Sequence, residues 1–209
     1  MTALERRSVT SLALLYNFRM LGLFMVLPLL ALYAIDFEGA TPTLIGIALG
    51  AYGLTQACLQ IPFGWLSDRV GRKPVIIGGL LIFAFGSIVA ALADSIYGII
   101  LGRALQGAGA IASSVMALVA DLTRPEQRTK AMAIVGASIG LAFALALVLG
   151  PLVAGFGGLE AVFGFTAFLA LCGIAIVTWQ IPDPPRTGIT HTEVGARPGL
   201  MGLSLRNPT

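Results

Sequence analysis

Six long apolar runs separated by short polar stretches dominate the hydrophobicity pattern of the chain. About 20 apolar residues in a helix cross a bilayer, and only a helix satisfies its own backbone groups within lipid. The short polar stretches make each helix antiparallel to the next. The pattern therefore predicts an all-α membrane protein, a bundle of six transmembrane helices over residues 10–181. The runs cover residues 10–35, 42–67, 74–93, 96–120, 130–154 and 159–181.

The two ends of the chain are polar. Residues 1–9 precede the first run, and from Pro182 to Thr209 the chain is polar and begins with three prolines within four residues. Such a composition is typical of a flexible segment. The first run is too long for the apolar core of a signal peptide. We therefore expect the N-terminal segment to be retained and residues 182–209 to form a flexible tail.

Composition agrees with a membrane protein and excludes several other classes. Hydrophobic residues make up 57% of the chain and charged residues 11%, with a mean hydropathy of +0.91, whereas soluble proteins carry about 25% charged residues. The net charge of +3 does not indicate nucleic-acid binding, because the charges lie at helix ends rather than in one patch. Cys58 and Cys172 lie inside apolar runs without CxxC spacing, so we expect no disulfide, metal or cofactor.

Positive residues fall on alternate connections. The connections that hold Asp36, Glu38, Asp94 and Glu160 contain no Lys or Arg. Since positively charged loops remain on the cytosolic side, we expect a multi-pass protein of the cytoplasmic (inner) membrane with both termini in the cytosol. The positive residues are Arg6 and Arg7 before the first run, Arg69, Arg72 and Lys73 before the third, Arg124, Arg128 and Lys130 before the fifth, and Arg186, Arg197 and Arg206 after the sixth.

Polar side chains within the runs are concentrated in the first, second and fourth. A charge at the centre of a membrane helix costs about 2.5–3.5 kcal/mol, so such residues usually face a cavity or a partner. We therefore expect these three helices to line a substrate cavity, and the third and sixth helices to face lipid. The cavity candidates are Tyr16, Asn17 and Arg19 in the first run, Tyr52 and Gln56 on one face of the second, and Gln106 in the fourth, beside Arg103.

The two buried arginines, Arg19 and Arg103, leave two interpretations open. In the first they are structural, and Asn17, Gln106 and backbone carbonyls satisfy them. In the second they meet a substrate or a titrating carboxylate. No Asp or Glu lies deep in any run, so a proton-carrying acid is absent, supplied by another region, or replaced by unconventional chemistry.

A charged hairpin, residues 64–73, joins the second and third runs. Asp68 and Arg72 are spaced i, i+4 and can pair, and Gly71 permits a tight turn. The hairpin resembles the Gly-x-Leu-x-Asp-Arg-x-Gly-Arg-Lys signature loop of the major facilitator superfamily. That resemblance implies a gating latch, in which Asp68 docks onto a second half of a transporter and Arg72 bridges to Asp121; the alternative is a loop that only sets topology. The matching residues are Gly64, Leu66, Asp68, Arg69, Gly71, Arg72 and Lys73.

Three further motifs carry the same resemblance. The segment from Arg103 through Gln106 and Gly107 to Gly109 is similar to the fourth-helix Arg-x-x-Gln-Gly-x-Gly signature, which implies a role of Arg103 in proton coupling. Leu21-Gly22 followed by Pro28 is similar to the first-helix pattern of drug:proton antiporters, with Leu30 in place of a second proline. Gly150-Pro151 with Gly155 is similar to the fifth-helix antiporter signature, with Ala146 and Ala154 in place of glycines. We expect Pro28, Gly107, Gly109, Gly150 and Pro151 to serve helix packing.

Residues 5–181 thus resemble the N-terminal half of a twelve-helix transporter of the drug:proton antiporter type, built as 3+3 inverted repeats. The resemblance implies proton-driven export of small amphipathic compounds, although two buried arginines also suit an anionic substrate. The chain then needs a second six-helix half, or a second copy of itself. We favour the separate half, because an identical copy does not obviously supply the helix that Asp68 meets. The alternative is a partner-binding bundle that transports nothing.

Two short motifs have simpler explanations. Gly136-Ala-Ser138-Ile-Gly140 fits a Gly-x-Ser-x-Gly nucleophile elbow, but the only histidine, His191, lies in the tail, so we expect no enzyme activity. Gly46 and Gly50 form a Gly-x-x-x-Gly pair, which we expect to pack against a neighbouring helix of the same chain.

Overall fold

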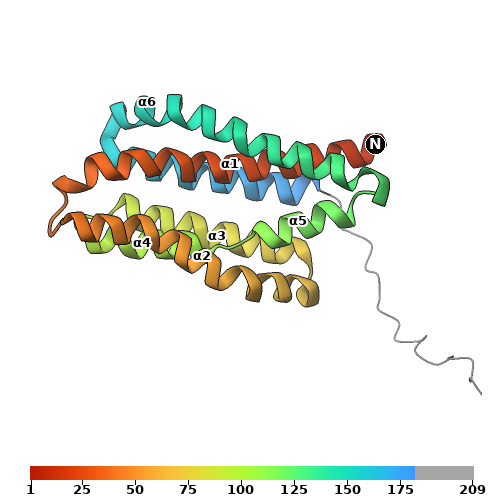
Figure 1. The fold of residues 1–209 in the computed structure, drawn as a ribbon, viewed down its shortest axis with the longest axis horizontal. Coiled ribbons are helices and arrows are strands. Elements are labelled where there is room, and N and C mark those ends of the chain that lie inside the picture. Colours follow the sequence, from red (N-terminus) through yellow and green to blue (C-terminus); the bar gives the residue numbers. More distant parts are fainter. Residues whose placement is uncertain (182–209) are drawn as a thin grey trace, which may run out of the picture.

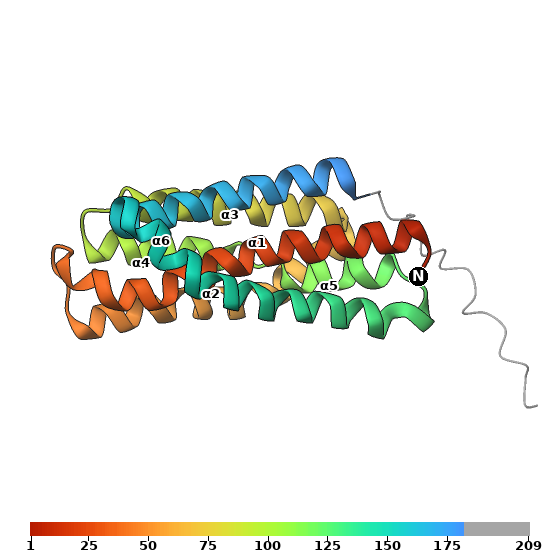
Figure 2. The same ribbon diagram turned by 90° about the horizontal axis from the view of Figure 1, so that it is seen from above.

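The computed structural model describes residues 1–181, which form a bundle of long helices (Figure 1). The flexible tail expected over residues 182–209 lies outside the described residues. The bundle is elongated, and its helices run along its long axis in both views (Figures 1 and 2). The elements are α1 (Ala3–Tyr33), a short 3-10 turn η1 (Ala34–Asp36), α2 (Pro42–Val70), α3 (Arg72–Ala91), α4 (Ile96–Ala108), α5 (Ala112–Asp121) and α6 (Pro125–Gln180).

The bundle makes six antiparallel crossings. Within residues 1–181, five helical stretches are long and apolar enough to cross a bilayer, and α4 and α5 together count as one of them. The sixth crossing arises because α6 folds back on itself, as Figure 1 shows. The reversal occurs at Gly157 and Gly158, where the backbone is not helical and Gly158 has φ +60°. Only glycine adopts that conformation readily. With α6 counted as two crossings, the predicted six-helix bundle is confirmed.

The crossing expected over residues 96–120 is present, as the span Ile96–Asp121, but it is not one continuous helix. The helix breaks at residues 109–111, between α4 and α5. At this point the chain passes so close to α3 that a Cβ atom on Gly109 would collide with the carbonyl oxygen of Gly79. Irregular backbone at membrane depth is tolerated where protein covers it, and residues 109–111 are all buried.

Small residues set the spacing of the other helices. A Cβ atom on Gly86 of α3 would lie 2.6 Å from the amide nitrogen of Gln106 in α4, and one on Gly107 of α4 would collide with the Tyr52 carbonyl of α2. Gly150 of α6 lies against α1, where its Cβ would be 3.6 Å from the Cα atom of Met25. Three of the expected packing glycines, at positions 107, 109 and 150, therefore lie at close helix contacts. Pro28 and Pro151 lie inside α1 and α6.

One face of α3 buries Phe83, Ser87 and a stripe of apolar residues against α4 and α6. Its other face exposes Leu81, Phe85 and Ile88, which is compatible with the expectation that the third helix faces lipid.

The expectation that Gly46 and Gly50 pack within the chain was wrong. The helix that carries them, α2, has few buried residues. Its Gly46 and Gly50 pack against nothing in the described part of the chain, since a Cβ atom on either would meet no atom within 4 Å. The uncovered face of α2 is therefore available to something outside residues 1–181.

Candidate functional site

Polar side chains from four helices meet inside the bundle, in a cluster that we call the polar centre. Arg19, Arg103 and Gln106 are each at most 1% exposed, and Tyr52 is 5% exposed. Burial of this extent removes water from both guanidinium groups, so protein contacts or a ligand must compensate for the lost hydration. Its members are Arg19 of α1, Tyr52 and Gln56 of α2, Ser87 of α3, and Arg103 and Gln106 of α4.

Arg19 is anchored by the break between α4 and α5. Its Nη2 donates to the carbonyl oxygen of Gly109, 2.9 Å away, and to Oε1 of Gln56 at 3.2 Å. Asn17, expected to help satisfy Arg19, instead donates from Nδ2 to the carbonyl oxygen of Ser138 at 2.7 Å and so ties α1 to α6. Tyr16 is buried one turn before Arg19 on the same helix. The interruption of the fourth crossing thus leaves the Gly109 carbonyl free to accept from Arg19. The sequence did not suggest this acceptor, because it carried no sign of the interruption.

Arg103 begins a hydrogen-bond chain that joins α4 to α3. Its Nη1 donates to Oε1 of Gln106 at 2.9 Å, and Nε2 of Gln106 donates to Oγ of Ser87 at 2.8 Å. The Ser87 hydroxyl in turn donates to the carbonyl oxygen of Phe83. Sequence reasoning missed Ser87, because a lone serine in an apolar run carries no signal of its partner. This series of hydrogen bonds fixes the side chains of Gln106 and Arg103 relative to α3.

Tyr52 connects the two arginines. The Cζ atom of Arg103 lies 4.7 Å from the centroid of its ring, and that of Arg19 lies 5.9 Å from it and 5.3 Å from the Phe83 ring. Contacts of this kind stabilise a desolvated cation by about 2 kcal/mol. Neither arginine forms an ion pair with any residue of the described region. The polar centre therefore holds two positive charges that aromatic rings and amide oxygens stabilise only in part.

The charged hairpin is organised around Arg72. Its Nη1 forms an ion pair with Oδ1 of Asp68 at 2.5 Å and donates to Oγ of Ser67 at 2.8 Å, while its Nε lies 3.2 Å from Oδ2 of Asp121. Gly71 makes the turn with φ +112°, a conformation that favours glycine. The expected contact between Arg72 and Asp121 is present, and it joins the α2–α3 turn to the end of α5.

Three other residues of the hairpin have different surroundings: an aromatic ring, a neighbouring helix and solvent. The Cζ atom of Arg69 lies 3.7 Å above the Trp65 ring. Gly64 lies close to α5, where a Cβ atom would be 3.2 Å from Oγ of Ser113. The Asp68 side chain is 61% exposed, so it keeps an accessible carboxylate in addition to its pairing with Arg72.

Arg72→Gln is expected to destabilise the bundle more than Asp121→Asn does. The arginine contacts Asp68, Ser67 and Asp121 and its side chain is 19% exposed, whereas the Asp121 side chain is 42% exposed and pairs with Arg72. Exposed pairs contribute about 0.2–1 kcal/mol, so we expect under about 1 kcal/mol for Asp121→Asn and about twice that loss for Arg72→Gln. Thermal unfolding in nanodiscs measures both changes; equal losses would contradict the central position of Arg72.

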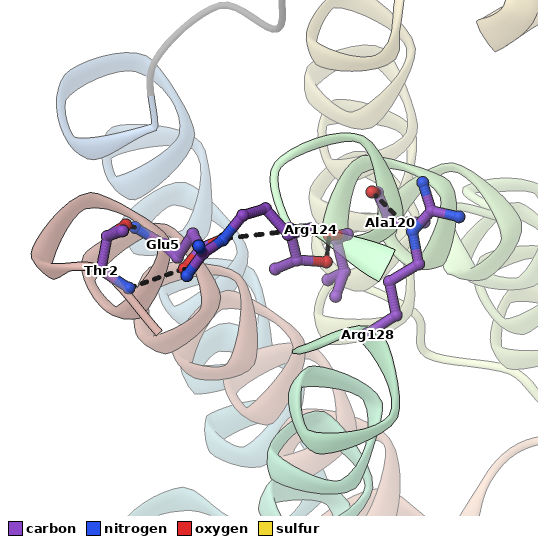
Figure 3. Close-up of polar contacts among 7 residues, drawn as sticks. Thr2, Glu5, Ala120, Arg124 and Arg128 are labelled. Atoms are coloured by element: carbon purple, nitrogen blue, oxygen red, sulfur yellow. Dashed lines mark hydrogen bonds and ion pairs between the residues drawn. The ribbon is translucent and has the colours of Figure 1, made fainter. Parts of the chain in front are cut away.

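A second polar cluster, which sequence reasoning missed, holds the start of α1 against the α5–α6 turn (Figure 3). Glu5 and Thr2 form a capping box at the N-terminus of α1. Arg124 donates from Nε to Oε1 of Glu5 at 2.9 Å, and its backbone amide donates to the same oxygen. Arg128 donates from Nε to the carbonyl oxygen of Ala120 nearby. The Thr-x-x-Glu spacing predicts such a cap, but its contact with Arg124 depends on the tertiary fold.

Glu5 makes the stability of this contact pH dependent. Hydrogen bonds from the Arg124 side chain, and then from the Thr2 backbone, lower the pKa of Glu5 from 4.5 to about 2. A lowered folded-state pKa means that the contribution is complete above pH 4.5 and is lost as the pH falls towards 2. Glu5→Gln should remove this part of the acid sensitivity in unfolding measured from neutral pH down to about the folded-state pKa of 2. The control is Glu160→Gln, an exposed carboxylate at the α6 reversal, which should retain the wild-type pH profile.

Comparison with known proteins explains why these features occur together. The family model described as Major Facilitator Superfamily matches residues 12–207. The chain belongs to the major facilitator superfamily. The inner membrane transport protein YajR of Escherichia coli K12 is 55% identical over 208 residues, which cover 100% of this chain and 46% of that protein.

Two other known proteins match part of the chain at lower identity. The multidrug resistance protein MdtH of Aeromonas salmonicida is 36% identical over 132 residues, covering 57% of this chain and 33% of MdtH. The fold also matches the solved structure of a bacterial homologue of the human lysosomal transporter Spinster, with a TM-score of 0.78 and 18% sequence identity. The match covers 89% of this chain and 45% of that one. This last likeness concerns the fold alone. The chain spans about half the length of the curated relatives it matches.

Membership of the superfamily accounts for the arrangement of the two sites. The described residues form a part of the N-terminal half of the major facilitator fold, in a multi-pass membrane protein. The polar centre lies among the first four crossings of that half. The charged hairpin lies between its second and third crossings, at the same end of the bundle as the N-terminus, the α5–α6 turn and the end of α6 (Figure 1).

Proposed function

We propose that the chain forms the N-terminal half of a secondary transporter that exports small amphipathic compounds in exchange for protons. Transport proceeds by rocking this half against a second six-helix half around the polar centre. The observation that carries the proposal is the pair of arginines, Arg19 and Arg103, buried deep in a bundle that crosses the membrane. A charge in that position is costly and marks a substrate or ion pathway. Arg103 is the candidate for proton coupling.

The uncovered helices support the need for a second half. Little of α2 is buried, and the first arm of α6 buries mainly a narrow stripe of small residues. Gly46, Gly50 and Gly53 of α2, and Gly136 and Gly140 of α6, have open space where a Cβ atom would be. Small residues on a membrane helix allow another helix to approach closely. A second half packed on these faces would close the polar centre from the side.

The charged ends support an orientation and a gate. The connections with Lys and Arg lie at one end of the bundle, which the positive-inside rule assigns to the cytosol of a bacterial inner membrane. The name of YajR places that relative in the inner membrane, and the name of MdtH associates that relative with multidrug resistance. Asp68 is exposed at the cytosolic end, where it latches onto the second half, with Arg72 and Asp121 fixing its position.

Flux in proteoliposomes tests the proposal. The chain is reconstituted alone and together with the C-terminal half of YajR from Escherichia coli, and efflux of a fluorescent amphipathic dye is followed after a pH gradient is imposed. We expect gradient-dependent flux only with both halves. Absence of flux in both preparations would favour a partner-binding bundle, and flux by the chain alone would favour a homodimer.

A further inference from the structure

The donors of the polar centre are only partly used. In Arg103, Nη1 binds Gln106, but Nε and Nη2 are buried without a hydrogen-bond partner within residues 1–181. In Arg19, Nη2 is bound, whereas Nε and Nη1 have no partner in the same region. The Tyr52 hydroxyl is also unpartnered there. Buried polar groups are nearly always hydrogen-bonded, so these unused donor atoms around one aromatic ring need an explanation.

The geometry of Arg103 indicates what these donors fit. Nε and Nη2 lie on the same edge of the guanidinium plane, and their two N–H bonds are parallel. That edge binds the two oxygens of a carboxylate at once, which a spherical ion does not match. Gln106 accepts from the remaining nitrogen, Nη1, and is itself held by its hydrogen bond to Ser87, so the free edge is fixed in place before any ligand arrives.

Charge points to the same ligand. Both guanidiniums contact the Tyr52 ring, and neither has a carboxylate partner in the described region. Two cations in a low-dielectric interior repel each other and lose their hydration, and an anion between them relieves both costs. The rings of Tyr52 and Phe83 also present apolar surface beside the charges.

We propose that the polar centre is a binding site for a carboxylate, held by the free edge of Arg103 with Arg19 and the Tyr52 hydroxyl as further donors. The inference rests on the proposed transport site and names its ligand class. The carboxylate comes either from a small organic acid or from a side chain of the second half. The free edge of Arg103 would bind a carboxylate from either source in the same way, and a binding experiment separates the two.

Equilibrium binding of radiolabelled benzoate to the purified full chain in nanodiscs tests the site. We expect saturable binding that acetate competes for and chloride at equal ionic strength does not. Arg103→Lys, which keeps the charge and loses the two-pronged edge, should weaken binding at least about tenfold, the effect of about 1.4 kcal/mol. Tyr52→Phe should weaken it a few-fold. Arg7→Lys makes the same chemical change at an exposed position and should change nothing.

Each outcome decides the proposal. No saturable binding to the wild-type chain, or equal binding by wild type, Arg103→Lys and Tyr52→Phe, would overturn it and leave water as the partner of these donors. Binding to the chain alone that disappears when the second half is added assigns the carboxylate to that half, and binding that persists assigns it to a free acid. The assay needs neither a gradient nor a second half, so loss of flux with intact benzoate binding refutes transport and not the site.

Discussion

Gly86→Ala lowers the stability of the bundle by about 1–3 kcal/mol, the usual cost of overpacking a well-packed interior. The added Cβ atom would lie 2.6 Å from the amide nitrogen of Gln106 and 2.8 Å from the carbonyl oxygen of Gly102. These are backbone atoms, so no side-chain rotation relieves the contact and α4 must move away from α3. Thermal unfolding in nanodiscs measures the loss.

The matched control for this change lies two turns earlier on α3. A Cβ atom on Gly78 would meet no atom within 4 Å, and alanine is a better helix former than glycine. Gly78→Ala should therefore be neutral or slightly stabilising. Similar losses for the two variants would show that α3 and α4 are not as close as the structure places them.

Arg103→Met should lower transport by the paired halves about 100-fold and leave the bundle folded. Hydrogen bonds to charged groups contribute about 1.5–3 kcal/mol, and a loss of about 2.7 kcal/mol slows a step about 100-fold. The folded state loses less, because a buried charge without an ion-pair partner is itself costly and an apolar side chain of similar size is often tolerated. The variant leaves mainly Oε1 of Gln106 without its donor.

This variant separates the two interpretations of Arg103. A purely structural arginine predicts a large fall in melting temperature and flux that falls only in proportion to the amount of folded protein. A functional arginine predicts loss of flux at nearly wild-type stability. Arg7→Met, at an exposed position before the membrane, is the control and should retain both. Dye efflux per mole of folded protein, with the melting temperature measured on the same preparation, gives both quantities.

Sequence predicted the six crossings and the charged hairpin for related physical reasons. Lipid forces every apolar run of sufficient length into a helix, and the contact of Asp68 with Arg72 joins residues only four positions apart in the sequence. Arg19, Tyr52 and Arg103 were identified as candidates because polar residues in lipid are rare.

The partners of these residues depend on tertiary packing and were not predicted. Asn17 binds α6 rather than Arg19, because its neighbours are set by how α1 packs and not by sequence distance. The break at Gly109 was missed because a hydropathy pattern carries no information on the close contact between Gly109 and Gly79 of α3. Ser87 and the contact of Glu5 with Arg124 likewise join segments far apart in sequence.

In the proposed transport cycle, the polar centre opens alternately to the two sides of the membrane. Gln60→Cys, one turn beyond Gln56 on α2, reports on access without altering the centre, in a chain whose Cys58 and Cys172 are replaced by alanine. Phe168→Cys on α6, 57% exposed on the outside of the bundle, is the control.

The measurement is labelling by a membrane-impermeant maleimide, added to either side of vesicles that contain both halves. The maleimide should reach the thiol introduced by Gln60→Cys mainly from one side, and the accessible side should switch when the pH gradient is reversed. The Phe168→Cys control should not respond to the gradient. Reactivity of the Gln60→Cys variant from neither side, or reactivity that the gradient does not change, would contradict alternating access.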